Sequence, residues 1–80
     1  MNRREFETRL SAARHLCPSA AYRRGYERGL RRLYHGQDFG TQEEHDKFLS
    51  LVGDVDPDRA ETGRGYADGF AGRPVLETDD

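Results

Sequence analysis

The sequence is poor in the residues that build a large core or a covalent framework. It has one cysteine, Cys17, so no internal disulfide can form, which fits a reducing compartment. It has no tryptophan, and hydrophobic residues make up only 34% of its 80 positions. A chain of this size and composition is expected to form one small domain with a thin core.

The sequence also lacks segments that direct a chain into a membrane. Residues 1–7 include no apolar run of the kind found in signal peptides. No apolar stretch approaches the ~20 residues that a helix needs to span a bilayer. We therefore expect a cytoplasmic protein.

Charge is distributed unevenly along the chain. Residues 1–37 hold nine Arg against three Glu, whereas residues 38–80 hold four basic and twelve acidic side chains. Such asymmetry indicates charged partners. The alternative is that the two halves neutralise each other across the fold.

One short sequence pattern occurs twice. Residues 24–30 read Arg-Gly-Tyr-Glu-Arg-Gly-Leu, and residues 64–70 read Arg-Gly-Tyr-Ala-Asp-Gly-Phe, 40 positions later. The spacing predicts two similar halves. Because a glycine inside a helix costs ~1 kcal/mol relative to alanine, the paired glycines are expected to let another backbone approach closely.

Capping residues and apolar periodicity predict four helices and no strand. Ser19, the pair Thr41 and Glu44, and Asp56 followed by Pro57 are typical helix starts. The pattern therefore predicts an all-α fold, a small bundle of about four helices arranged as two helix-turn-helix hairpins, with the two repeat-bearing helices side by side. The predicted helices are residues 2–17, 20–35, 42–52 and 57–71, within one domain of residues 1–74 that is followed by a short acidic tail, 75–80.

The helical wheel assigns an inner face to each segment. In the last helix it places Gly65 and Gly69 on the side opposite Tyr66 and Phe70. The predicted inner residues of the other helices are Phe6, Leu10, Ala13 and Cys17 in the first, Tyr22, Tyr26, Leu30 and Leu33 in the second, and His45, Phe48, Leu49 and Val52 in the third.

No pattern in the sequence is typical of an enzyme or of a cofactor site. Residues 54–65 resemble a calcium loop at first, but the sixth and twelfth places hold Arg59 and Gly65 instead of the required Gly and Glu. The histidines and Cys17 lack zinc-site spacing, and the glycine-rich run 63–69 lacks a preceding strand. We expect a non-enzymatic protein that holds neither a metal nor another cofactor.

Two charged surfaces are candidates for binding a partner. Arg24, Arg28 and Arg31 form a stripe that could follow phosphates, with tyrosines as stacking surfaces for bases; alternatively, the arginines are a solvated face and the tyrosines are core. The second candidate is an acidic surface that could dock on a basic protein groove, or that merely keeps the chain soluble. Its residues are Glu43, Glu44, Asp46, Asp54, Asp56, Asp58, Glu61 and Asp68.

The run Gly63-Arg-Gly-Tyr-Ala-Asp-Gly-Phe-Ala-Gly-Arg73 is similar to a segment of ribosome modulation factor. Residues 17–29, which begin Cys-Pro and contain Gly25-Tyr26 and Gly29, resemble a second segment of that family, in the opposite order. This resemblance implies binding to a ribosome, or to nucleic acid more generally, through the arginine stripe.

As a class, small Arg-, Asp- and Gly-rich proteins without a catalytic set resemble accessory proteins of phages, such as anti-CRISPR proteins. This resemblance implies an inhibitor in the host cytoplasm that docks on a protein or ribonucleoprotein complex. The leading prediction is docking on a type I CRISPR surveillance complex, which blocks target DNA binding or nuclease recruitment. Direct binding of nucleic acid or a ribosome is the alternative.

Overall fold

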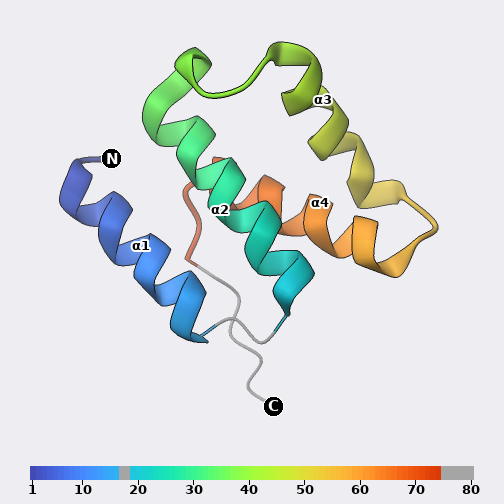
Figure 1. The fold of residues 1–80 in the computed structure, drawn as a ribbon, viewed down its shortest axis with the longest axis horizontal. Coiled ribbons are helices and arrows are strands. Elements are labelled where there is room, and N and C mark those ends of the chain that lie inside the picture. Colours follow the sequence, from blue (N-terminus) through green and yellow to red (C-terminus); the bar gives the residue numbers. More distant parts are fainter. Residues whose placement is uncertain (17–18, 75–80) are drawn as a thin grey trace.

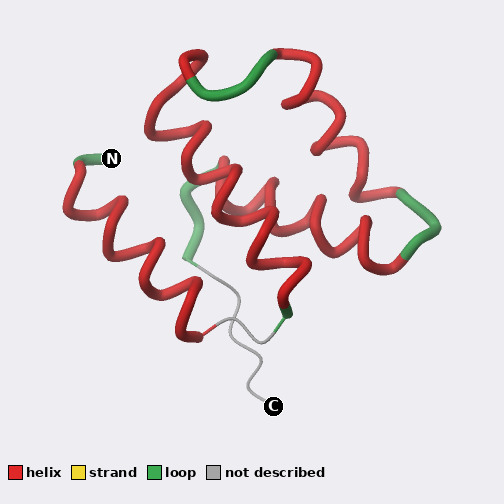
Figure 2. Tube along the Cα trace, in the orientation of Figure 1, coloured by secondary structure: helices red, strands yellow, loops and turns green. Residues whose placement is uncertain are grey.

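The computed structural model describes residues 1–16 and 19–74, with the backbone alone at Gln37. This part of the chain contains α-helices and single turns of 3₁₀ helix, with no strand (Figures 1 and 2). The predicted all-α bundle is confirmed. The elements are α1 (Arg3–Leu16), α2 (Ala20–His35), η1 (Gly36–Asp38), α3 (Gln42–Ser50), η2 (Leu51–Gly53) and α4 (Pro57–Phe70).

Each α-helix begins where a side chain accepts a hydrogen bond from a free backbone N–H of the first turn, which is the role of an N-cap. The third predicted helix differs at its end, because the α-helix stops at Ser50 and the chain tightens into the η2 turn. The four caps are Asn2 to Glu5 (2.8 Å), Ser19 to Tyr22 (3.1 Å), Thr41 to Glu44 (3.1 Å) and Asp56 to Asp58 (2.9 Å).

Helices α2 and α4 cross at the centre of the molecule, as Figure 1 shows. Helix α1 packs on α2, and α3 packs on α4. The Cα atoms span 36 × 35 × 15 Å, so the fold is a plate about two helices thick. Such a plate leaves a broad face of α1 and α2 open to solvent.

Glycines bring α2 and α4 into backbone contact at their crossing. A Cβ atom on Gly25 would lie 2.8 Å from the amide nitrogen of Tyr66, and one on Gly65 would lie 2.9 Å from that of Tyr26. Gly29 and Gly69 are related in the same way, because each faces the backbone of the other helix. The predicted close approach is therefore confirmed, and the repeat makes both sides of one crossing.

The prediction that Gly65 and Gly69 lie on the outer side of the last helix was wrong, since both are buried. A helical wheel finds the inner face from apolar side chains. Glycine has no side chain, so the wheel cannot assign these two residues to the buried face. In α4, the surface that contacts α2 is defined by the absence of side chains.

The largest fully buried side chains belong to Tyr26 and Leu30, which are both 0% exposed. The Tyr26 hydroxyl donates to the carbonyl of Arg73 at 2.6 Å, and the Tyr66 hydroxyl lies 2.7 Å from Nδ1 of His45. Burial raises the pKa of both tyrosine hydroxyls above the ordinary value of 10.0. Both groups therefore stay protonated at neutral pH and join the core to neighbouring segments.

Several residues predicted for the inner faces lie at the surface instead. Leu33 and Leu49 are 38% exposed, and Val52 is 43% exposed. The predictions for these three residues were wrong because the thin plate covers only part of each helix. Cys17 and the predicted tail, residues 75–80, lie outside the described residues.

Within residues 1–16 and 19–74, no helix has both the length and the apolar character that crossing a membrane requires.

Candidate functional site

A groove runs between α2 and the α3–α4 hairpin. It consists of three adjoining hollows of about 370, 320 and 240 Å³. Five residues each line two of the three hollows: Arg24, Arg28, Phe48, Leu51 and Thr62. We call this surface the α2–α3 groove. Its complete lining is Arg23, Arg24, Glu27, Arg28, Arg31, Glu44, Lys47, Phe48, Leu51, Asp58, Arg59 and Thr62.

The α2–α3 groove is cationic although the whole chain is acidic. Six Arg and Lys side chains and three carboxylates line it, which gives a local charge of +3 against −2 for the protein. Among the described residues, none pairs with the charged ends of Arg23, Arg24 and Lys47. These three cations remain available to an anionic ligand.

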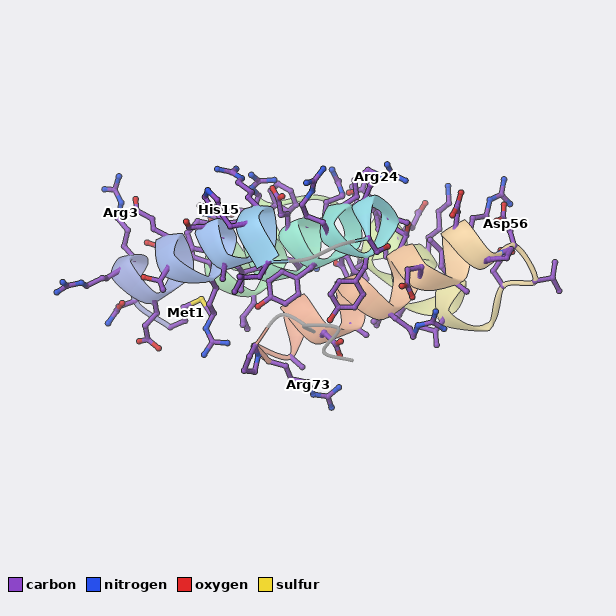
Figure 3. All side chains as sticks on the ribbon, turned by 90° about the horizontal axis from the view of Figure 1, so that it is seen from below. Met1, Arg3, His15, Arg24, Asp56 and Arg73 are labelled. Carbon is purple, nitrogen blue, oxygen red and sulfur yellow. The ribbon has the colours of Figure 1, made fainter. Side chains whose placement is uncertain are left out.

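Arg24 lies on the open face of α2. Figure 3 shows it pointing away from the α4 side of the plate, together with Arg3 and His15, whereas Arg73 lies on the other side. This placement agrees with the solvated stripe expected from the sequence. The rest of the stripe is tied into the fold to different degrees.

Arg31 is only loosely held. Its guanidinium lies 3.6 Å from the carboxylate of Glu27, which also lies 3.6 Å from Arg14 of α1. One carboxylate thus faces two guanidinium groups, so part of their positive charge stays uncompensated. The side chains of Arg31 and Glu27 are 33% and 16% exposed, so the pair is partly buried, but 3.6 Å is a long contact that leaves Arg31 able to meet a ligand anion.

Arg28 occupies the middle of the groove. Its guanidinium carbon lies 5.2 Å from the centre of the Phe39 ring and 5.3 Å from that of Phe48. Its Nη2 lies 2.6 Å from Oε1 of Glu44. Its Nε is buried and has no hydrogen-bond partner among the described residues, a defect that costs about 1–3 kcal/mol in a buried donor.

Arg32, which the sequence places near the basic stripe, turns inward instead. It is 6% exposed, and its guanidinium donates to the carbonyls of Phe39 and Gly40 at 3.0 and 3.3 Å. It also donates to Oε1 of Gln42 at 3.3 Å. Arg32 therefore closes the loop between α2 and α3 and takes no part in the groove.

The predicted tyrosine stacking surfaces are not accessible. Tyr22 and Tyr26 are buried, and the Tyr34 ring stacks on Phe6 at 4.3 Å between centroids. The groove instead contains the aromatic ring of Phe48. The alternative, that these tyrosines belong to the core, is the one that the structure bears out, since Tyr22 and Tyr26 are buried and Tyr34 packs against the core cluster.

Most of the predicted acidic surface is engaged within the protein. The hydroxyl of Tyr22 donates to Asp68, which also accepts from Arg73 at 3.1 Å, and Glu61 pairs with Arg64. Asp56 caps α4. These residues therefore serve as internal ion-pair partners, hydrogen-bond acceptors and a helix cap, and they do not form one continuous acidic surface.

The turn before α4 is the most exposed part of the predicted acidic surface, although Asp56 caps the helix and lies 3.9 Å from Arg59. Val55 is 99% exposed and projects between Asp54 and Asp56, and Asp58 follows in the first turn of the helix. Asp54 accepts from the backbone N–H of Asp56 at 2.8 Å, which shapes the turn. We call residues 54–58 the acidic tip; Glu43 lies exposed elsewhere, in the first turn of α3.

Sequence reasoning missed several lining residues of the groove, among them Lys47, Phe48 and Arg59. Lys47 and Arg59 come from the acidic half of the chain, and Phe48 was assigned to the core. A weak signal existed for Lys47, the single lysine of the chain. None of them could be joined to the arginine stripe without knowing how α4 crosses α2 and how α3 packs on α4.

No family model matches this chain, and neither does any curated protein or solved structure. In the described part of the chain, no three His, Cys, Asp or Glu side chains are arranged to hold a metal ion. The chemistry that the groove offers is the recognition of anions by guanidinium and ammonium groups beside an aromatic ring.

Proposed function

We propose that this chain is a non-enzymatic binding protein whose α2–α3 groove holds a nucleic acid. The observation that carries the proposal is the row of cations along the groove, of which Arg23, Arg24 and Lys47 have no partner among the described residues. Guanidinium groups make bidentate contacts to phosphate, and neutralising phosphates releases counterions from the nucleic acid. The sequence resemblance to ribosome modulation factor is in keeping with this proposal.

The proposal predicts salt-dependent binding. The full chain is titrated into fluorescently labelled RNA and DNA oligonucleotides, and anisotropy is measured between about 50 and 300 mM salt. Three to five phosphate contacts give an expected slope of roughly −2 to −4 in log K against log salt. The absence of binding at the lowest salt, or an affinity that salt leaves unchanged, would show the proposal to be wrong.

A second function is favoured by the acidic tip. An apolar side chain that is 99% exposed, flanked by carboxylates, suits docking into a pocket with a basic rim on another protein. The partner expected from the class resemblance is a type I CRISPR surveillance complex, which the tip would occlude. In that case the protein acts as an anti-CRISPR inhibitor.

The test of this second function is the double substitution Val55→Ser and Asp58→Lys, measured against a purified surveillance complex. Because Asp58 also lines the α2–α3 groove, the same variant is titrated with the oligonucleotides, whose binding it is expected not to weaken. Asp56 is left unchanged because its loss as a cap would itself cost about 1 kcal/mol. The affinity is expected to fall at least tenfold, which corresponds to about 1.4 kcal/mol.

The matched control for the tip is Val52→Ser with Glu43→Lys, which removes an exposed valine and a first-turn carboxylate elsewhere. This control is expected to bind as the original protein does. Equal losses in both variants would assign docking to general charge, and no binding of the unaltered protein would end the hypothesis.

A further inference from the structure

The ring of Phe48 is a fixed platform within the groove. One of its faces stacks on Tyr66, with 4.8 Å between centroids and 9° between planes. Tyr66 is 3% exposed and its hydroxyl is hydrogen-bonded to His45, so the Tyr66 ring is held in place against Phe48. A ligand can therefore reach Phe48 only from the side of Arg28.

Arg28 holds that position with incomplete bonding. Its flat guanidinium lies near Phe48 and Phe39, contacts of the cation–π type. Its carboxylate partner, Glu44, is about two-fifths exposed, and its buried Nε has no partner among the described residues. A phosphate offers this guanidinium the bidentate contact that its present position lacks.

We propose that the groove binds single-stranded nucleic acid, with one unpaired base stacked on Phe48 in the place of Arg28. Arg28 then turns outward to a phosphate of the same strand. This inference rests on the proposed nucleic-acid function and names its substrate class. A planar base has the shape of the guanidinium that it replaces, and stacking accepts every base because each has a π-face.

Double-stranded nucleic acid does not fit this arrangement. The bases of a duplex are paired and stacked inside the double helix. A duplex therefore presents phosphates to the cations of the groove but no free base to the Phe48 ring. The adjoining hollows of about 370 and 320 Å³ meet at Arg28 and Phe48, which gives an unpaired base room beside the face of the ring that Tyr66 does not cover.

The chain contains no tryptophan, so Phe48→Trp creates a single fluorescent reporter at the platform. A single-stranded oligonucleotide is expected to quench this fluorescence in proportion to binding, because a stacked base contacts the indole. The duplex of the same sequence is expected to leave it unchanged. Single-strand binding without quenching would overturn the stacking proposal, while the proposed function would stand.

A second variant, Phe48→Leu, keeps an apolar floor but removes the stacking ring. The affinity for the single strand is expected to fall about tenfold, with the weaker affinity for the duplex unchanged. Phe39→Leu is the control, since Phe39 contacts Arg28 but does not line the groove. Equal affinities for single strand and duplex would overturn the inference, whereas no binding to either would overturn the proposed function itself.

Discussion

The substitution Gly65→Ala is expected to abolish the folded state or to lower its stability by at least about 4 kcal/mol. The new Cβ would lie 2.9 Å from the amide nitrogen of Tyr26 and closer still to the carbonyl oxygen of Tyr22. Overpacking against side chains typically costs 1–3 kcal/mol. Here both obstacles are backbone atoms of α2, so relief requires the two central helices to move apart.

The effect is large relative to the whole stability of the protein. A domain of 80 residues is expected to be stable by roughly 4–12 kcal/mol. In a domain of this size each kcal/mol shifts Tm by about 4–8 °C. Thermal unfolding followed by circular dichroism is therefore expected to show a fall of more than about 16 °C, or no cooperative transition at all.

The repeat supplies a second copy of the same experiment. Gly25→Ala places its Cβ 2.8 Å from the amide nitrogen of Tyr66, the equivalent position on the other helix, and is expected to be as damaging as Gly65→Ala. Gly53→Ala is the matched control, because no atom other than its chain neighbours lies within 4 Å of its Cβ. The control is expected to change stability by less than about 1 kcal/mol. A Gly65→Ala protein that melts within a few degrees of the control would contradict the backbone contact at the crossing.

The sequence was a good guide to where the helices are. Capping side chains such as Ser19 and Asp56 act within one turn, so their roles can be predicted from neighbouring residues alone. The repeat at Gly25 and Gly65 also predicted that a backbone approaches closely. These features depend on local geometry and on spacing, which a sequence states directly.

The packed face of α4 could not be found in the same way. Wheels rank faces by side-chain apolarity, and in α4 the buried strip is formed by Gly65 and Gly69, which have no side chain. Applying the 40-residue repeat to the faces would have helped, because Gly25 and Gly29 border the apolar stripe of α2. The repeat therefore indicated the buried face of α4, although the apolar side chains of α4 did not.

From the sequence, the site could be predicted only for residues that lie on the same helix. Arg24 and Arg31 lie on the groove as the stripe suggested, but their neighbour Arg32 is buried under a loop. Phe48 and Lys47 lie on α3, which packs on α4, and they join the arginines because the Arg28 side chain reaches across to α3. These residues lie close together only because of the tertiary packing, which the sequence patterns did not predict.

Reversing two charges of the groove tests whether the cations carry nucleic-acid binding. In the variant Arg24→Glu with Arg31→Glu, the groove loses four units of positive charge and changes from +3 to −1. The affinity for single-stranded RNA or DNA at low salt is expected to fall by about a hundredfold or more, with the salt slope reduced by about two. Anisotropy titrations at several salt concentrations measure both quantities.

The substitutions are chosen so that folding is little affected. Arg24 has no ion pair among the described residues, and Arg31 meets Glu27 only at 3.6 Å. The two new carboxylates lie three and four residues from Glu27, and each such like-charge pair costs about 0.2–0.5 kcal/mol, which thermal unfolding can verify. Arg28 is kept, because changing it would also disturb the ring contacts on Phe48.

The matched control is Arg3→Glu with Arg4→Glu, which changes the net charge equally at the start of α1, outside the groove. New carboxylates favour the positive end of the helix, which offsets the loss of the exposed pair between Arg3 and Glu7, so the control is expected to fold well. If binding depends on the groove, the control keeps most of its affinity while the groove variant loses it. Equal losses in the two variants would mean that net charge alone governs binding, and the α2–α3 groove would not be the site.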